Sequence, residues 1–430
     1  MREYLRNIFR WRPTSTDDLD QAEQRILDHV KTPFKTFYVD IGQGWNLDHV
    51  KIWTLQMDAS EPVNEPPLVL VHGFASGIAL WSLNFDELSQ NGKRSIYAFD
   101  GLGFGKSSRP KFTFPRLCNL SAKERALKHA EEMESQLVDC MEKWRSQMGG
   151  KLNGRFVLLG HSFGGYLAAA YALKYPEHIS RLILADPFGF QGDSQQEVSE
   201  NGRITSAKQY PMAIKMGTKL FLDILTPLSI LRASGPWGPK LISNVRADIE
   251  AKFSELSLNE TTQTDETINQ NDPKTRQIGM IMNYLYHCNV QCPPSGEIAF
   301  KKLIHYTAWP RMPMLERISS IAKQIPIDFI YGSQSWIDYE TGYKAQSMMP
   351  NHKVDVHLIK GAGHHVYADQ AYEFNQLVSK ICSNAVGDKS YNRERNANDE
   401  KSRAPEARDS KLKERKPFKI ETSATRVEVN

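Results

Sequence analysis

The sequence predicts an α/β protein in which a mostly parallel, eight-stranded sheet carries helices on both faces and an inserted helical cap. Continuous apolar runs such as Leu68 to Val71 are typical of strands that are buried on both faces. Helix-forming segments follow most of these runs, and this alternation is typical of a parallel sheet covered by helices. The alternation stops between Phe188 and Leu315, where apolar helical stretches replace the strands.

The pattern of apolar and polar residues places each element along the chain. The first two strands alternate in a way that favours an antiparallel pair with one solvated face. A capped helix precedes them, because Thr14-Ser15-Thr16 and the aspartates that follow favour a helix start, with the helix continuing through Val30. The expected strands are 37–41, 49–56, 68–71, 95–99, 156–159, 182–186, 327–331 and 354–359. The other expected helices in the core are 124–147, 166–171 and 370–379.

Shifts in composition divide the chain into five parts. The segment 254–275 is polar and a poor core former, and the chain after 384 is charged with few apolar residues, which favours disorder. The expected parts are an N-terminal segment and helix (1–32), the first part of the core (33–187), a helical cap (188–318) with the polar insertion 254–275, the second part of the core (319–383) and a charged tail (384–430).

The overall composition excludes several classes of protein. With 40% hydrophobic and 24% charged residues, the 430-residue chain is not disordered as a whole. A formal charge of +4 is too small to indicate a nucleic-acid binder. Five cysteines are few and odd in number, which fits a reducing compartment. Because no paired set of metal ligands is present, we expect no metal site, and the sequence implies no organic cofactor.

The first residues form a short, basic, amphipathic segment. Leu5, Ile8 and Phe9 would share one helical face, and arginines spaced four apart would lie on another. With Trp11 nearby, this segment could contact a membrane or lipid-droplet surface, or it could dock on the protein itself. The arginines interrupt any signal-peptide core, and no later segment offers about 18 uncharged apolar residues. We expect a cytoplasmic protein that is peripheral on lipid droplets or endomembranes.

The run Gly160-His161-Ser162-Phe163-Gly164 is a G-x-S-x-G turn between a strand and a helix. The turn is so tight that side chains two positions before and after the serine would collide, which explains Gly160 and Gly164. The N-terminus of the following helix favours negative charge near Ser162. His161 is expected to pack and form hydrogen bonds rather than titrate in catalysis. Ser162 is therefore the candidate nucleophile.

A serine nucleophile needs a histidine base and a carboxylate that orients the base. In this type of turn the partners follow in the order serine, acid, histidine. We assign Asp338 as the acid and His364 as the base, because each lies in a loop after the carboxyl end of a strand. Asp186 is the alternative acid, although the proline after it suits a turn into the cap. His365 is the alternative base.

Two further features concern the same loops. The backbone N–H groups of Phe74 and Phe163 are expected to bind the oxyanion of the tetrahedral intermediate. His364 and Asp369 also have the spacing found in glycerolipid acyltransferases. Asp369 is more simply explained as a carboxylate near the start of the last helix, where it complements the helix dipole.

Several longer motifs resemble the α/β-hydrolase fold family, and within it the abhydrolase-domain-containing 4 and 5 subfamily. The resemblance spans roughly residues 5–383 and implies the α/β-hydrolase fold with an inserted cap. The motifs that carry it are Trp11–Ser15, Phe99–Gly105, Leu184–Phe190, His305–Pro313 and Gly361–Asp369.

This resemblance implies two kinds of function. One kind of member resembles a lysophospholipase or phospholipase that acts on N-acyl phosphatidylethanolamines and other glycerophospholipids. The other resembles a lipid-droplet protein that activates a triglyceride lipase and carries asparagine at the nucleophile position. Because Ser162 is present, we expect a serine hydrolase that cleaves acyl esters of glycerophospholipids and also of triacylglycerol.

The alternatives are a coactivator of a triglyceride lipase and a lysophosphatidic acid acyltransferase. The implied partners are a glycerolipid or phospholipid substrate, a lipid-droplet or membrane surface, and a triglyceride lipase or droplet coat protein, with no nucleic acid.

Overall fold

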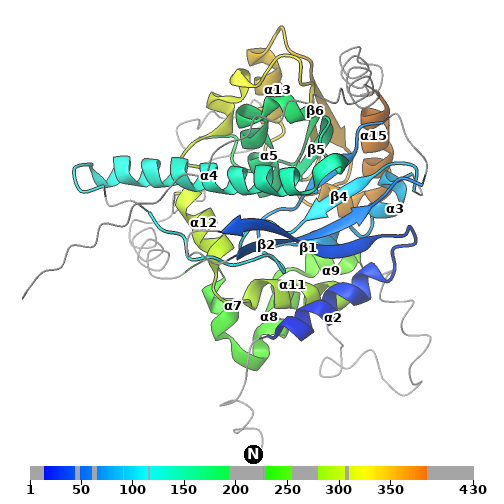
Figure 1. The fold of residues 1–430 in the computed structure, drawn as a ribbon, viewed down its shortest axis with the longest axis vertical. Coiled ribbons are helices and arrows are strands. Elements are labelled where there is room, and N and C mark those ends of the chain that lie inside the picture. Colours follow the sequence, from blue (N-terminus) through cyan, green and yellow to red (C-terminus); the bar gives the residue numbers. More distant parts are fainter. Residues whose placement is uncertain are drawn as a thin grey trace, which may run out of the picture.

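The computed structural model describes residues 14–43, 49–60, 65–90, 92–114, 117–192, 226, 228–253, 279–305 and 309–384. An eight-stranded sheet with the order β1-β2-β4-β3-β5-β6-β7-β8 forms its centre (Figure 1). Strand β2 pairs antiparallel with β1 and β4, and the other neighbours pair in parallel, which confirms the predicted sheet. The strands are β1 (Lys35–Gln43), β2 (His49–Met57), β3 (Leu68–Val71), β4 (Ile96–Phe99), β5 (Phe156–His161), β6 (Ile179–Ala185), β7 (Ile327–Gly332) and β8 (Val354–Ile359).

Both faces of the central strands are buried. Successive side chains point to opposite sides of a strand, so neighbouring residues join different apolar clusters. In β3, Val69 and Val71 join one apolar cluster, while Leu68 and Leu70 join the other. Helices α4 and α5 cover the first face, and α2, α11 and α15 contribute to the second cluster (Figure 1). Because helices cover both faces, the central strands have continuous apolar sequences.

Helices surround the sheet, and further helices lie in the described parts of the interval between β6 and β7. The helices of the core are α2 (Thr16–Leu27), α3 (Phe85–Leu88), α4 (Ala122–Gln147), α5 (Phe163–Lys174), α13 (Glu340–Met348), α14 (Val366–Asp369) and α15 (Ala371–Asn384). Those between β6 and β7 are α7 (Ser229–Ala233), α8 (Gly238–Val245), α9 (Ala247–Lys252), α11 (Met280–Val290) and α12 (Ser295–Leu303). Within the described residues, no helix is both long and apolar enough to cross a bilayer.

Helix α2 begins as the sequence predicts, at a capping box. The Ser15 hydroxyl accepts a hydrogen bond from the Asp18 amide, and the Asp18 carboxylate accepts one from the Ser15 amide. Farther along, the buried Glu23 accepts a hydrogen bond from Trp53 Nε1 at 2.8 Å, which ties the helix to β2.

Several expectations fall on residues outside the described ranges. The lipid-contact residues Leu5, Ile8, Phe9 and Trp11 lie there, as do the insertion 254–275 and nearly all of the tail 384–430.

Candidate active site

Ser162 lies at the tip of the turn between β5 and α5, in a backbone conformation that few non-glycine residues adopt. Its φ is 54°, in the left-handed region. A Cβ at Gly160 would collide with the Gly164 carbonyl, and a Cβ at Gly164 would collide with the backbone of β3. The two flanking glycines therefore let the strand, the turn and the helix pack in contact, as the sequence predicts.

A chain of hydrogen bonds runs from Ser162 through His364 to Asp186. Ser162 Oγ lies 3.0 Å from His364 Nε2, and His364 Nδ1 lies 2.6 Å from Asp186 Oδ2. A carboxylate only accepts, so Nδ1 carries the proton and Nε2 is free to accept from the serine hydroxyl. This is the arrangement in which a histidine can act as general base.

Asp186, and not the predicted Asp338, is the aspartate that contacts His364, so the prediction of Asp338 as the acid is wrong. Asp186 directly follows β6, which lies between β5 and β7 in the sheet. Its φ of 45° turns the chain immediately after the strand. Asp338 instead accepts hydrogen bonds from Gln191 Nε2 at 3.0 Å and from the Glu340 amide at 3.1 Å, at the start of α13.

Asp186 is fully buried, and two hydrogen-bond donors contact its carboxyl group. Burial raises the pKa of Asp186 well above its ordinary value. The hydrogen bonds that Ser335 Oγ donates at 2.5 Å and the Gly332 amide donates at 3.3 Å act in the opposite direction. These two donors come from the end of β7 and its loop, so that loop serves the site through Asp186.

Two further histidines near the site, the buried His161 and the partly buried His365, form hydrogen bonds with groups other than the serine hydroxyl. His161 Nε2 donates to the His364 carbonyl at 2.9 Å, which confirms its expected packing and hydrogen-bonding role. His365 Nε2 accepts from the guanidinium of Arg246 at 3.1 Å. Burial holds the pKa of both His161 and His365 well below the ordinary value, which favours the neutral form of each imidazole. Through its hydrogen bond to the His364 carbonyl, His161 positions the loop that carries His364.

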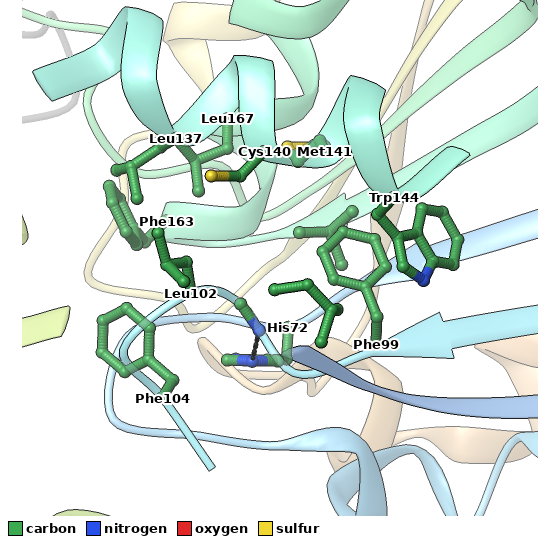
Figure 2. Close-up of a pocket in the computed structure, with 13 residues that line it drawn as sticks. His72, Phe99, Leu102, Phe104, Leu137, Cys140, Met141, Trp144, Phe163 and Leu167 are labelled. Carbon is green, nitrogen blue, oxygen red and sulfur yellow. Dashed lines mark hydrogen bonds between the residues drawn. The ribbon is translucent and has the colours of Figure 1, made fainter. Parts of the chain in front are cut away.

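The loop after β3 brings the expected oxyanion donor Phe74 toward the nucleophile. A Cβ at Gly73 would lie only 3.2 Å from Ser162 Cβ, so glycine permits this close approach. His72 fixes the loop, because Nδ1 donates to the Gly73 carbonyl at 2.7 Å and Nε2 accepts from the Gly101 amide at 2.9 Å. Figure 2 shows the second of these bonds as a dashed line at His72. Burial lowers the pKa of His72, which keeps this tautomer neutral.

An apolar cavity lies behind this loop, between the sheet and helices α4 and α5. Figure 2 shows Phe104, Phe163 and Trp144 among its lining residues. The cavity measures about 20 Å³, which is enough for roughly one water molecule. An acyl chain therefore does not fit there. Outside the cavity, Phe300 of α12 stacks on Phe74 with the ring centroids 4.2 Å apart.

Asp369, the second residue of the acyltransferase-like spacing, holds the His364 loop. Its Oδ2 accepts from the Gly363 amide at 2.7 Å, and its Oδ1 forms an ion pair with Lys252 of α9. Asp369 ends α14 and precedes α15, so it lies between these two helices. These contacts give it a role in positioning the loop.

Comparison with known proteins places the chain in a family. A family model described as the alpha/beta hydrolase fold matches residues 66–371. The chain belongs to the α/β-hydrolase fold family. A mouse (Lyso)-N-acylphosphatidylethanolamine lipase is 40% identical over 370 residues, which cover 86% of this chain and 93% of the lipase. The human 1-acylglycerol-3-phosphate O-acyltransferase ABHD5 is 39% identical over 370 residues, covering 86% and 90% of the two chains. These relatives confirm the subfamily that the motifs indicate.

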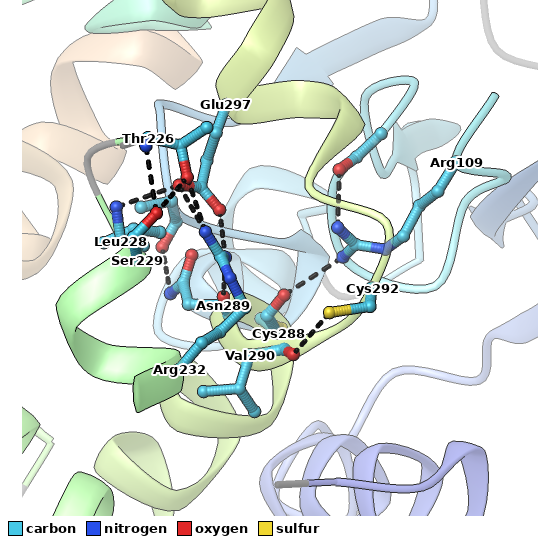
Figure 3. Close-up of polar contacts among 12 residues, drawn as sticks. Arg109, Thr226, Leu228, Ser229, Arg232, Cys288, Asn289, Val290, Cys292 and Glu297 are labelled. Carbon is cyan, nitrogen blue, oxygen red and sulfur yellow. Dashed lines mark hydrogen bonds and ion pairs between the residues drawn. The ribbon is translucent and has the colours of Figure 1, made fainter. Parts of the chain in front are cut away.

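In this α/β-hydrolase, a polar network joins the helices after β6 to the loops of the site (Figure 3). Asn289 of α11 donates from Nδ2 to the carbonyl of Ala75, the residue after Phe74, at 2.9 Å. Arg109 donates to the carbonyls of Gly103 and Cys288 at 2.8 and 3.0 Å. Helix α11 thus contacts the backbone of the loop after β3 directly.

Replacing Asn289 with alanine removes a partly buried hydrogen bond that holds the Phe74 loop. We expect kcat for ester hydrolysis to fall about tenfold with little change in KM, because one misplaced oxyanion donor weakens transition-state binding selectively. Steady-state kinetics checks this, with Asn244→Ala as the control because Asn244 is an exposed asparagine on α8. Equal kinetics for both variants would contradict a positioning role for Asn289.

The buried Glu297 holds the same network together. Its carboxylate pairs with both terminal nitrogens of Arg232 and accepts from the Leu228 amide at 2.8 Å. Glu297→Gln leaves the Arg232 cation in a largely buried site without its counter-charge, so we expect a loss of about 3 kcal/mol in unfolding free energy. Urea unfolding measures this loss. The control is Glu131→Gln, which breaks an exposed pair with Lys128 and should cost below about 1 kcal/mol; equal losses would contradict the account.

Proposed function

We propose that this protein is a serine hydrolase that cleaves acyl esters of glycerophospholipids. The hydrogen-bonded series Ser162, His364 and Asp186 is the observation that carries the proposal. Ser162 Oγ attacks the ester carbonyl while His364 Nε2 takes its proton, and Asp186 stabilises the imidazolium that forms. The amides of Phe74 and Phe163 bind the oxyanion.

The tetrahedral intermediate then breaks down and releases the alcohol. His364 Nε2 returns the proton to the leaving alcohol oxygen, and the acyl group remains on Ser162. A water molecule next attacks the acyl carbonyl while the same nitrogen accepts its proton, which releases the fatty acid and restores the serine. Both half-reactions use the three side chains, the two backbone amides and water.

The substrate class rests on the relatives. The mouse relative is named for lipase activity on (lyso)-N-acylphosphatidylethanolamine, and the human relative for acyl transfer to a 1-acylglycerol-3-phosphate. Both names describe glycerophospholipids, so we propose this class here, with triacylglycerol as a further ester substrate. We also propose that the protein works at the surface of a membrane or lipid droplet, where such lipids reside, and that the helices of residues 188–318 form a cap over the site.

A lipid panel tests this function. Purified protein is incubated with vesicles of phosphatidylcholine, lysophospholipid and N-acyl phosphatidylethanolamine and with emulsified triacylglycerol, and free fatty acid is measured by mass spectrometry. The same protein treated with a fluorophosphonate provides the blank. We expect release from at least one glycerophospholipid above the blank. Release from none of these lipids would overturn the proposal, and transfer of the acyl chain to lysophosphatidic acid instead of water would favour the acyltransferase alternative.

A further inference from the structure

Trp336 is an exposed tryptophan beside the histidine of the site, and the mechanism described above does not use it. Its indole lies 4.9 Å from the imidazole of His364, measured between the ring centroids, at an interplanar angle of 46°. The side chain is 68% exposed. A single exposed apolar side chain indicates no site by itself, so the argument depends on how Trp336 is held and on what its ring contacts.

The loop after β7 holds the backbone on both sides of Trp336. The hydroxyl of Ser335 donates to the carboxylate of Asp186 at 2.5 Å, and the amide of Ile337 donates to the same hydroxyl at 3.0 Å. The residues before and after Trp336 are therefore tied to the acid of the site. A ring on such a fixed backbone loses little further freedom when a ligand packs against it, which favours binding.

A series of aromatic rings leads from Trp336 to the residues expected to bind the oxyanion. The ring centroids of Trp336 and Phe188 are 6.5 Å apart, and those of Phe188 and Phe300 are 5.5 Å apart. Phe300 stacks on Phe74 at 4.2 Å and meets Phe163 edge to face at 5.0 Å. These separations are typical of aromatic pairs in contact. The series therefore begins at the proposed base and ends at both oxyanion residues.

The backbone of Phe188 also contacts the nucleophile. Its amide donates to the carbonyl of Ser162 at 3.1 Å. An ester bound for attack has its carbonyl carbon at Ser162 Oγ, its carbonyl oxygen at the two oxyanion amides and its leaving oxygen near His364 Nε2. The acyl chain is bonded to the same carbon, so it begins beside the series of rings that joins His364 to Phe74.

We propose that Trp336, together with Phe188 and Phe300, forms a subsite for the acyl chain of the substrate. The inference rests on the proposed function, because it assigns part of the same site. A hydrocarbon chain gains free energy by burying its apolar surface against these rings, and it needs no polar partner there.

Two soluble esters with the same leaving group test the subsite. p-Nitrophenyl hexanoate and p-nitrophenyl acetate differ only in the acyl chain, and both are supplied as dissolved monomers so that no lipid surface takes part. We expect the wild type to prefer the hexanoate in kcat/KM. In Trp336→Ala this preference should fall about tenfold or more, because each methylene group that loses its apolar contact lowers binding about fourfold.

Two further variants serve as controls. Trp237, in the segment directly before α8, is a tryptophan that is 63% exposed, and Trp237→Ala should change the preference by less than about twofold. Trp336→Phe should keep most of the preference, because an aromatic ring remains in contact with the chain. Circular dichroism verifies that each variant is folded.

An unchanged preference in Trp336→Ala would overturn the subsite, and if both rates fell together Trp336 would only position His364. An equal loss of preference in Trp237→Ala would also overturn it, because the effect would not be specific to this site.

Failure of the proposed function is distinguishable from failure of the subsite. If the wild type hydrolysed neither ester, the proposed hydrolase function would fail, and the binding of dodecanoate, measured by isothermal titration calorimetry, would decide the subsite. We expect the Kd of Trp336→Ala to be about tenfold higher than that of the wild type. Equal affinities, or no binding by the wild type, would then overturn the subsite.

Discussion

Replacing Ser162 with alanine is expected to lower kcat for ester hydrolysis by roughly 10⁴- to 10⁶-fold. The reason is that no other group can form the covalent acyl intermediate, so only binding and the oxyanion donors would remain. Ser162 is largely buried, but alanine is smaller and meets the same strained φ of 54° as serine, so stability should change by less than about 1 kcal/mol. The assay measures fatty acid release under saturating substrate.

A matched serine change controls for effects on folding. Ser347→Ala alters an exposed residue of α13 and should leave kcat unchanged. If Ser162→Ala retained activity within tenfold of the wild type while folded, the nucleophile would lie elsewhere in the chain.

Replacing Asp186 with asparagine is expected to reduce kcat by about 10⁴-fold, because the amide would favour the wrong tautomer of His364 and could not stabilise its cation. Asparagine tolerates the left-handed conformation that Asp186 adopts at φ 45°, so the backbone should be preserved. Single-turnover kinetics measures the chemical step, and thermal unfolding checks the fold.

A comparison with Asp338→Asn tests which of the two aspartates is the acid that orients His364. Asp338 accepts from Gln191 and from the Glu340 amide, so its change should cost less than about tenfold in kcat. If Asp338→Asn abolished activity while Asp186→Asn spared it, the acid in the working enzyme would be Asp338, and the loop after β7 would have to rearrange toward His364.

The sheet could be predicted from the sequence because its strands follow one physical rule. Strands buried on both faces require continuous apolar residues, as in Leu68–Val71, and each such run became a strand close to the expected limits. The nucleophile turn was predictable for a similar reason, since Gly160 and Gly164 are required by local geometry around Ser162.

The acid of the site could not be predicted with equal success, because its position depends on the folded chain. Asp186 directly follows β6, and that proximity to a strand end was the available signal. The proline after it favoured an interpretation as a turn, whereas the positive φ of Asp186 and the hydrogen bond from Ser335 appear only in three dimensions. The contact of Asn289 with the Ala75 carbonyl joins residues far apart in sequence and left no local pattern.

The most direct test of the central claim is to find where an activated phosphonate attaches. The protein is incubated with a fluorophosphonate, digested and mapped by tandem mass spectrometry. The account predicts a single adduct on the peptide that contains Ser162, and its loss in the Asp186→Asn variant over the same interval. An adduct on another residue, or no adduct on folded protein that hydrolyses lipid, would contradict it.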